Sequence, residues 1–200
     1  MHLNVHSITY GTLMNGPGKR NMVHLQGCTL KCNGCFSTHT WSPEDNEIVP
    51  IRNLAEELLL ENPEGITISG GEPMQQPDGV IALLHTIRSE STRKGIENLS
   101  ILMYTGYTVK ELQSQGVYAE LSVLLDILVS GRYDKKRRTG YGLRGSANQK
   151  ITIFSEKHTM SELTEDNNIL EVSIGSDEIH VTGFPTKDTV KKLKNSLEGI

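Results

Sequence analysis

The stretch Gln26-Gly-Cys28-Thr-Leu-Lys-Cys32-Asn-Gly-Cys35-Phe-Ser-Thr-His-Thr-Trp41 contains all three cysteines of the chain. Three thiolates spaced Cys-x3-Cys-x2-Cys on one short loop can converge on a single metal centre, and two glycines within the loop relax its backbone. With only three protein thiolates, a cubane [4Fe–4S] cluster keeps one iron free of protein ligands, which is the open position that catalysis requires. The stretch therefore predicts a catalytic iron–sulfur centre held by Cys28, Cys32 and Cys35.

A structural zinc site is the main alternative for the same loop. His39 follows the cysteines and completes a Cys3His ligand set with the short spacings that zinc sites use. Plain burial as small apolar side chains does not fit three cysteines that lie within eight residues beside Lys31 and Asn33. On the loop alone, both metal centres stay open.

Three further stretches accompany the cysteine loop: Ser69-Gly-Gly-Glu-Pro73, Tyr104-Thr-Gly-Tyr107 and Arg144-Gly-Ser-Ala-Asn-Gln149. In this order and with these cysteines, they resemble the radical S-adenosylmethionine (SAM) superfamily, and within it the activating enzymes of anaerobic ribonucleoside-triphosphate reductase. The aromatic residue Phe36 follows the third cysteine instead of preceding it, which is typical of this activase branch. The resemblance covers residues 1–154 and does not extend to residues 155–200.

The resemblance implies a [4Fe–4S] cluster on the three cysteines, which are then the catalytic residues, and SAM as the second cofactor. The SAM site that it implies comprises Phe36, Gly70, Gly71, Glu72, Pro73, Thr105, Ser130, Asn148 and Gln149. The two glycines would let the backbone approach the methionyl end of SAM, and Glu72 would accept hydrogen bonds from it. A plain turn at the end of a strand is the alternative for this stretch.

The other implied positions each have a structural alternative. Phe36 would shield the cluster or pack against adenine, or it belongs to the core. Thr105 and Ser130 offer hydroxyls to ribose or carboxylate oxygens, or they serve helix capping and turns. Asn148 and Gln149 present amides to SAM, or they hold the chain by structural hydrogen bonds.

Segments of strand and helical character alternate along the chain. Strands are predicted at 3–9 (an edge strand), 22–26, 65–69, 99–104, 124–129 and 150–154, and helices at 51–60, from Asp78, and from the capping box Thr108–Glu111. The alternation predicts an α/β fold, and right-handed crossovers would curl it into an open, partial βα barrel of the radical SAM type. A hairpin (169–174 and 178–182) and a helix (186–197) are expected to complete it and to extend or cover the sheet. The cysteine loop, the Gly-Gly-Glu-Pro stretch, the Thr-Gly-Tyr stretch and Ser130 then all follow the carboxyl ends of strands, where α/β folds place active sites.

Composition favours one domain over residues 1–200 in a reducing compartment. The chain has 36% hydrophobic and 22% charged residues, no apolar run of membrane-spanning length, and a first segment without a signal peptide. We therefore expect a cytoplasmic protein with no membrane partner. The net charge of −4 argues against nucleic acid, and the basic run Lys135–Arg138 is interpreted as a solvated loop. Three crowded cysteines argue against disulfides and allow one cluster only.

The function that the resemblance implies is activation of a separate glycyl-radical enzyme, most plausibly anaerobic ribonucleotide reductase. The enzyme would cleave SAM reductively and use the 5′-deoxyadenosyl radical, with a flavodoxin-like or ferredoxin-like protein as electron donor. A small radical SAM enzyme that acts on a metabolite, like carboxydeazaguanine synthase, is the first alternative. A non-enzymatic metal-binding module is the second.

Overall fold

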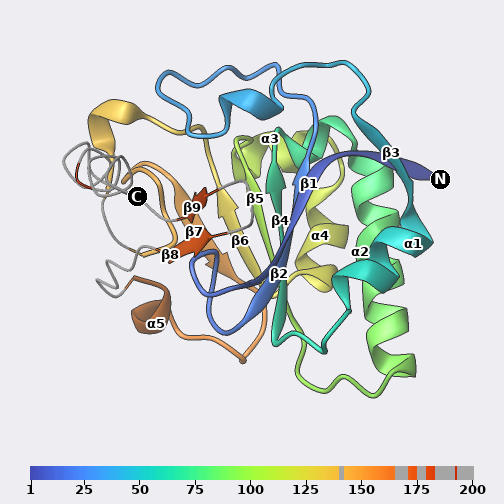
Figure 1. The fold of residues 1–200 in the computed structure, drawn as a ribbon. Coiled ribbons are helices and arrows are strands. Elements are labelled where there is room, and N and C mark those ends of the chain that lie inside the picture. The colour runs from blue at the N-terminus through green and yellow to red at the C-terminus, as the bar shows by residue number, and fades with distance from the viewer. Residues whose placement is uncertain (140–141, 165–170, 175–178, 183–191, 193–200) are drawn as a thin grey trace.

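The structure, a computed structural model, describes residues 1–200 except 140–141, 165–170, 175–178, 183–191 and 193–200. Among the described residues, seven strands form one sheet in the order β3-β1-β2-β4-β5-β6-β7 (Figure 1). They are β1 His2–Thr12, β2 Arg20–Leu25, β3 Glu47–Pro50, β4 Gly65–Gly70, β5 Ser100–Thr105, β6 Ile127–Ser130 and β7 Lys150–Ile153. Strands β2, β4, β5 and β6 run parallel, whereas β1, β3 and β7 pair antiparallel. The edges β3 and β7 are not paired with each other, so the sheet is open, and the predicted α/β class is confirmed.

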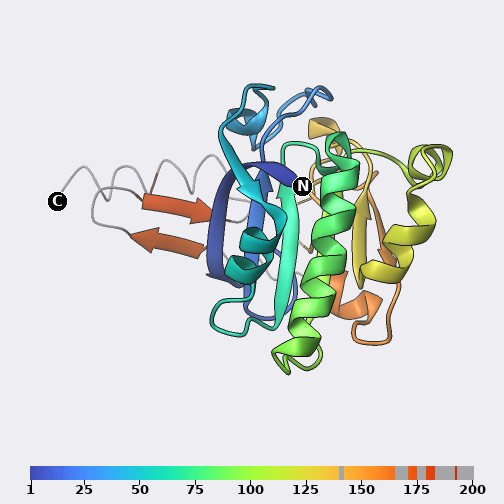
Figure 2. The same ribbon diagram turned by 90° about the vertical axis from the view of Figure 1, so that its right-hand side faces the viewer.

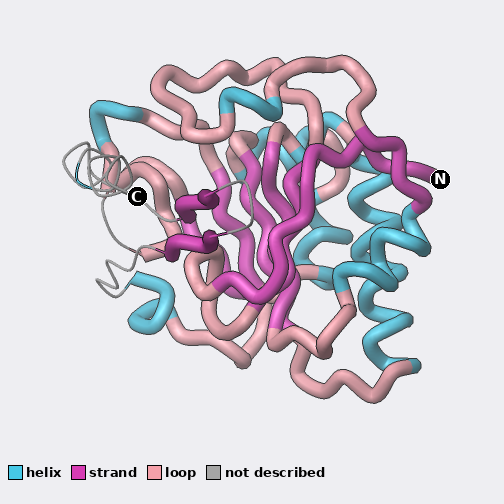
Figure 3. Tube along the Cα trace, in the orientation of Figure 1, coloured by secondary structure: helices cyan, strands magenta, loops and turns pink. Residues whose placement is uncertain are grey.

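Of the described helices, four pack on one face of this sheet, as Figures 2 and 3 show, and a fifth, short helix lies against the other face. They are α1 Ile51–Leu58, α2 Pro77–Arg93, α3 Val109–Ser114 and α4 Tyr118–Leu124, with α5 Met160–Thr164 further along the chain. Helix α1 illustrates the cause, because its buried residues Ile51, Leu54, Ala55 and Leu58 recur at helical spacing and form one apolar stripe. Short 3-10 turns η1 Thr38–Thr40, η2 Pro73–Gln75 and η3 Lys135–Arg137 lie in the loops between strands.

The other face of the sheet lacks α1–α4 and carries only the short α5 among the described helices, and the strand alternation shows why. In β5, Ile101 and Met103 belong to the core beneath the helices, whereas Leu102 belongs to a smaller cluster on the opposite face. In β4, the residues on that opposite face are Thr67 and Ser69, which cannot build an apolar core. This face therefore keeps space beside its smaller cluster.

The amino ends of the parallel strands are held by buried charges. Arg20 is fully buried and donates from Nε to Thr67 Oγ1 at 2.8 Å and from Nη2 to the carbonyls of Ile66 and Ser100 at 2.7 and 3.0 Å. Asp126, just before β6, contacts Arg88 at 2.7 Å and Lys157 at 3.1 Å. These contacts close the end of the sheet that lies away from the predicted site.

Three sequence-based expectations need correction within the sheet. Strand β1 is not an edge strand, because β3 pairs with it on the outside. The apolar segment 124–129 is not one strand, since α4 ends at Leu124 and β6 begins at Ile127. The second helix is capped by Gln76 with Pro77 at its first position, and Asp78 lies in its first turn. The capping box at Thr108 and Glu111 is confirmed.

The tail is described in part. The predicted hairpin is confirmed as β8 Glu171–Ile174 and β9 Ile179–Thr182, which pair antiparallel. It forms a two-stranded sheet of its own within the described residues, so it does not extend the main sheet as expected. The predicted helix at 186–197 lies outside the described residues. Across the part of the chain that the structure describes, no helix is long and apolar enough to cross a membrane.

Candidate functional site

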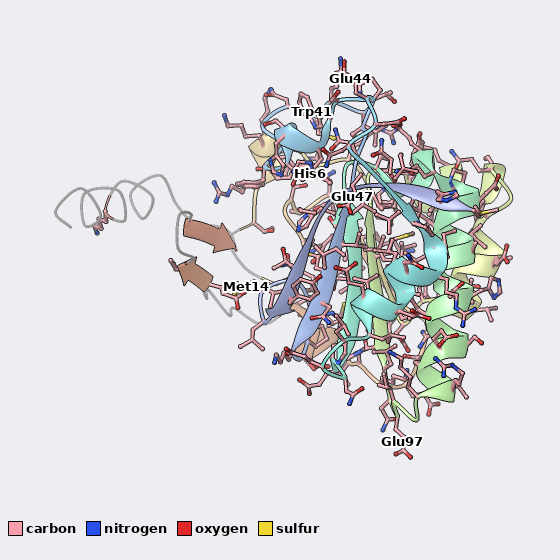
Figure 4. All side chains as sticks on the ribbon, turned by 45° about the vertical axis from the view of Figure 1, so that its right-hand side comes forward. His6, Met14, Trp41, Glu44, Glu47 and Glu97 are labelled. Carbon is pink, nitrogen blue, oxygen red and sulfur yellow. The ribbon has the colours of Figure 1, made fainter. Side chains whose placement is uncertain are left out.

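Loops that follow β2, β4, β5 and β6 meet at the carboxyl end of the parallel strands and surround one pocket of about 110 Å³. Trp41, which lines this pocket, lies at the upper end of the sheet in Figure 4. The lining includes Cys28, Cys32, Cys35, Ser69, Gly71, Glu72, Tyr104, Thr105, Gly106, Gly131, Tyr133 and Gln149. Sequence positions more than a hundred residues apart therefore come together, as the positions at strand ends predicted.

The cysteine loop is anchored by its backbone to the end of β4. Gly71 N donates to Leu25 O at 2.7 Å, and Glu72 N donates to Gly27 O at 2.9 Å. A Cβ on Gly71 would lie 2.1 Å from Gly27 O, and one on Gly70 would lie 2.1 Å from Leu25 N. Gly70 also has a φ of +106°, which disfavours other residues. The structure thus gives these glycines a role that sequence reasoning missed, which is close packing against the cysteine loop.

The zinc alternative for this loop requires four side chains close enough to bind a single ion. Among the described residues, no three His, Cys, Asp or Glu side chains are grouped so that they could hold one metal ion. His39 instead packs against His6 in a tilted arrangement, with ring centroids 4.8 Å apart. A zinc ion needs all its sulfur ligands at about 2.3 Å, whereas a cubane places each thiolate on a different iron. Cys28, Cys32 and Cys35 line one pocket without such a grouping, and a cubane accommodates thiolates that are spread around it.

Glu72 is almost fully buried, with 2% of its surface exposed, and it binds three groups of the chain. Its Oε1 accepts from Met74 N at 2.9 Å and from Thr105 Oγ1 at 2.6 Å, and its Oε2 accepts from Gly106 N at 2.7 Å. Burial raises the pKa of the carboxyl, and the three hydrogen bonds oppose that rise. Glu72 therefore joins the ends of β4 and β5, and Oε2 keeps capacity for a further donor. Pro73 is buried as the first residue of η2.

The remaining polar positions are mostly engaged within the rim. The Thr105 hydroxyl donates its hydrogen bond to Glu72, while Ser130 Oγ lies 3.4 Å from Lys150 O across the β6–β7 pair. Asn148 Nδ2 donates to Arg132 O at 2.8 Å, and Gln149 Nε2 donates to Gly131 O at 3.0 Å. Ser130, Asn148 and Gln149 thus fix the loop after β6 and the segment before β7, whereas Thr105 fixes the end of β5 to Glu72.

Phe36 is not a core residue, because 48% of its surface is exposed. Its ring meets Tyr133 edge-on at 5.6 Å, and the guanidinium of Arg138 lies 5.1 Å from the ring centroid. The core interpretation of Phe36 is therefore wrong, and the ring lies at the surface beside Cys35.

A second cavity of about 350 Å³ lies against the face of the sheet opposite α1–α4. Five residues line both this cavity and the cysteine pocket, so the two spaces adjoin: Cys35, Ser69, Tyr104, Tyr133 and Gln149. His24 also lines the cavity, and burial lowers its pKa to about 4, which keeps it neutral. Its buried Nδ1 has no hydrogen-bond partner within the described residues.

Sequence reasoning did not assign Tyr104, Tyr133 or Ser69 to the site. Ser69 and Tyr104 could have been found from their sequence positions, because polar residues near the carboxyl ends of buried strands face the rim of the site. Tyr133 lies in a loop three residues after β6, where only the structure shows its contact with Phe36.

The chain is similar to known proteins over most of its length. The family model described as "4Fe-4S single cluster domain" matches residues 14–152. An anaerobic ribonucleoside-triphosphate reductase-activating protein of Vibrio cholerae is 30% identical over 163 residues, which cover 76% of this chain and 99% of that protein. The protein of the same name from Enterobacteria phage T4 is 27% identical over 143 residues, covering 69% and 86%. A pyruvate formate-lyase-activating enzyme of Clostridium pasteurianum is 31% identical over 147 residues, covering 70% and 59%.

Proposed function

Because the chain belongs to the 4Fe-4S single cluster domain family, and within it to the radical SAM activating enzymes of glycyl-radical proteins, we propose that it installs a glycyl radical on an anaerobic ribonucleotide reductase. Its cofactors are a [4Fe–4S] cluster and SAM. When bound and reduced, they supply a 5′-deoxyadenosyl radical that can remove a Cα hydrogen from glycine. Everything else in the reaction depends on how this chain positions the reactants.

One observation carries the proposal: the cysteine pocket shares five lining residues with the cavity on the face of the sheet opposite α1–α4. A pocket for the cluster alone would suffice for a metal-binding module. The adjoining cavity of about 350 Å³ has the size of a small-molecule site and so offers room for SAM next to Cys35. Tyr104, Tyr133 and Met22 in its lining exclude water from a reactive intermediate.

We assign the site residues as follows. Cys28, Cys32 and Cys35 hold the cluster, and Glu72 offers Oε2 to the SAM amine while its other contacts keep it in place. Gly70, Gly71 and Pro73 shape the backbone that faces SAM. Phe36 packs against the adenine from the exposed side of the cysteine loop.

Thr105, Ser130, Asn148 and Gln149 act mainly by holding the rim in shape around SAM. Their side-chain hydrogen bonds join loops that lie far apart in sequence, so each loop is fixed by its neighbour. Preorganised loops need no rearrangement when SAM binds.

The fold is interpreted as a partial barrel of the radical SAM type, because four parallel strands joined by helices on one face form an open sheet. We treat residues 1–200 as one domain, since Leu163 of α5 packs with strand residues in the smaller cluster, on the face of the sheet opposite α1–α4. A cytoplasmic location and a flavodoxin-like or ferredoxin-like electron donor complete the proposal, because both match an oxygen-sensitive, reducible centre.

The test is anaerobic reconstitution with iron and sulfide, followed by dithionite, SAM and the anaerobic ribonucleotide reductase of the same cell. We expect 5′-deoxyadenosine by chromatography and a glycyl doublet by electron paramagnetic resonance on the reductase. Deoxyadenosine without a glycyl signal, together with faster SAM consumption when a small metabolite is added, would replace the activase by the metabolite enzyme. Protein that binds iron but never cleaves SAM would be a metal-binding module.

A further inference from the structure

The charge of the chain is unevenly distributed. The net charge is −4, yet the loop after β6 has five cations and one carboxylate between Arg132 and Arg138. All five of these cationic side chains are exposed. An isolated run of this kind is usually a solvated loop, so its place in the fold decides whether it has a function.

This basic run lies directly on the cysteine loop. A Cβ on Gly34, between Cys32 and Cys35, would lie 2.7 Å from Lys135 Cδ, so the lysine stem covers that glycine. Arg138 lies over the ring of Phe36 at 5.1 Å. Figures 1 and 2 show η3 beside the loop that precedes η1. We call the surface formed by Lys31, Arg132, Lys135, Lys136, Arg137 and Arg138 the basic collar.

Carboxylates neutralise only part of the collar. Arg132 pairs with Glu111 at 2.7 Å, and Arg137 pairs with Asp134 at 3.5 Å. Within the described part of the chain, Lys31, Lys135 and Lys136 form no ion pair. The collar therefore presents net positive potential around the exposed edge of the cysteine loop, on a protein that is negative as a whole.

We propose that the basic collar docks an acidic one-electron carrier of the flavodoxin class. The inference rests on the proposed function, because a centre held by the cysteines must be reduced before SAM is cleaved. Electron transfer between proteins requires the two redox centres to come close, and the collar is the surface that surrounds the cysteine loop. Redox partners form small, transient complexes that are steered by opposite charge, which is the kind of surface the collar provides.

The carrier supplies the one electron that this reduction needs. Flavodoxin hydroquinone gives up one electron and becomes the semiquinone, and the centre on Cys28, Cys32 and Cys35 gains that electron. The glycyl-radical partner must instead reach the cavity on the face of the sheet opposite α1–α4. Met14 also lines this cavity. Cys35, Phe36 and Ser37 line the same cavity, so it begins beside the cysteine loop, and Figure 4 shows that it reaches as far as Met14, well away from Trp41.

The test measures binding of oxidised flavodoxin to the reconstituted enzyme by anaerobic calorimetry. Lys135→Glu/Lys136→Glu should weaken binding about tenfold and flatten its salt dependence. The matched control is Arg93→Glu/Lys94→Glu, which makes the same charge change at the end of α2, near Glu97 at the lower end in Figure 4. We expect binding in this control to stay within about twofold of the unaltered enzyme.

A second readout separates docking from chemistry. Deoxyadenosine formation driven by dithionite should be unchanged in the collar variant, while formation driven by flavodoxin hydroquinone should fall. Equal weakening in both double variants, or unchanged binding in the collar variant, overturns the proposal. So does a collar variant that binds flavodoxin normally but no longer associates with the reductase.

Two further outcomes keep the test decisive. If the collar variant does not fold, flavodoxin binding to the unaltered enzyme is measured at rising salt concentrations instead. Binding that does not weaken as the salt concentration rises overturns the proposal. If the unaltered enzyme cleaves no SAM even with dithionite, the proposed function fails, while flavodoxin binding still reports on the collar by itself.

Discussion

Glu72 and Asp126 are carboxylates buried to the same degree, 2% exposed each, at opposite ends of one sheet. Although burial would raise the pKa of Asp126, hydrogen bonds from Arg88 and from Ile101 N lower it to about 2. Glu72 has no ion pair within the described residues, and burial raises its pKa. The amino end of the sheet thus satisfies its charges internally, whereas the carboxyl end keeps a buried acid without a paired cation among the described residues, at the place proposed above for the SAM amine.

The largest expected effect is at the carboxyl end. Cys35→Ala should lower the iron content from about four per chain and abolish deoxyadenosine formation, because two thiolates hold a cubane poorly. Unfolding of the cluster-free protein in urea should change by less than about 1 kcal/mol, since Cys35 is only half-buried. Ser37→Ala on the same loop is the control, and full iron with full activity in Cys35→Ala would refute the ligand assignment.

A pair of truncations tests the amino end. A chain that ends at Phe154 loses the bond from Lys157 Nζ to Leu99 O at 2.7 Å, the Ser100–His158 contact at 2.7 Å and the buried Leu163. It should be less stable by about 4 kcal/mol, from a lost core side chain and a broken buried pair. A chain that ends at Thr164 keeps these contacts and serves as the comparison in urea unfolding. Equal unfolding midpoints would show that these contacts do not hold the sheet.

Asp126→Asn should cost about 2 kcal/mol of unfolding free energy at neutral pH, because Arg88 and Lys157 lose their counter-charge. The carboxyl has an ordinary pKa of 3.8 and a folded value of about 2, so its stabilisation is present above the higher value and lost as pH falls through the lower one. The gap between variant and unaltered protein should therefore close between these two values. A gap that does not change with pH would exclude the ion pairs as its cause.

The smallest effect is expected for Glu72→Gln, with the opposite dependence on pH. Since the folded pKa of Glu72 is raised above its ordinary value of 4.5, its relative stabilisation is present below that value and lost as pH rises. The glutamine variant loses the acceptor for Gly106 N, at about 1 kcal/mol. Even so, the difference in unfolding free energy between the unaltered protein and the glutamine variant should shrink as pH rises above 4.5. Slopes of the same sign for both variants would show that the two ends do not differ as described.

Local pattern predicted much of the sheet. The strands predicted at 65–69 and 99–104 agree with β4 and β5 to within one residue, because apolar runs bounded by glycine or by a helix end are distinctive. The run that contains Leu124 and Leu125 could not be divided between α4 and β6, since both elements bury leucine in the same core. Strand β3 was missed because its four residues are mostly exposed and pair only at the edge.

The site was predicted as a set of positions but not as a set of contacts. The cysteine spacing and the positions at strand ends were sufficient to bring the loops together. The partners of Glu72 were not predictable, because Thr105 and Gly106 lie 33 and 34 residues away in sequence. Arg20 likewise resembles an ordinary surface cation in the sequence, whereas the structure buries it fully at the start of β2 and bonds it to β4 and β5.

The contact between Gly70, Gly71 and the backbone at Leu25 and Gly27 bears on protein engineering. With Cβ clashes near 2.1 Å on both sides, the cysteine loop cannot be transplanted as a sixteen-residue cassette into a host that lacks this pair of glycines. A graft must carry the ends of β2 and β4 together, in register, so that Gly71 N can reach Leu25 O. The smallest transferable unit is thus two neighbouring parallel strands and their loops, and a peptide that mimics the loop alone should bind its metal without the geometry that SAM requires.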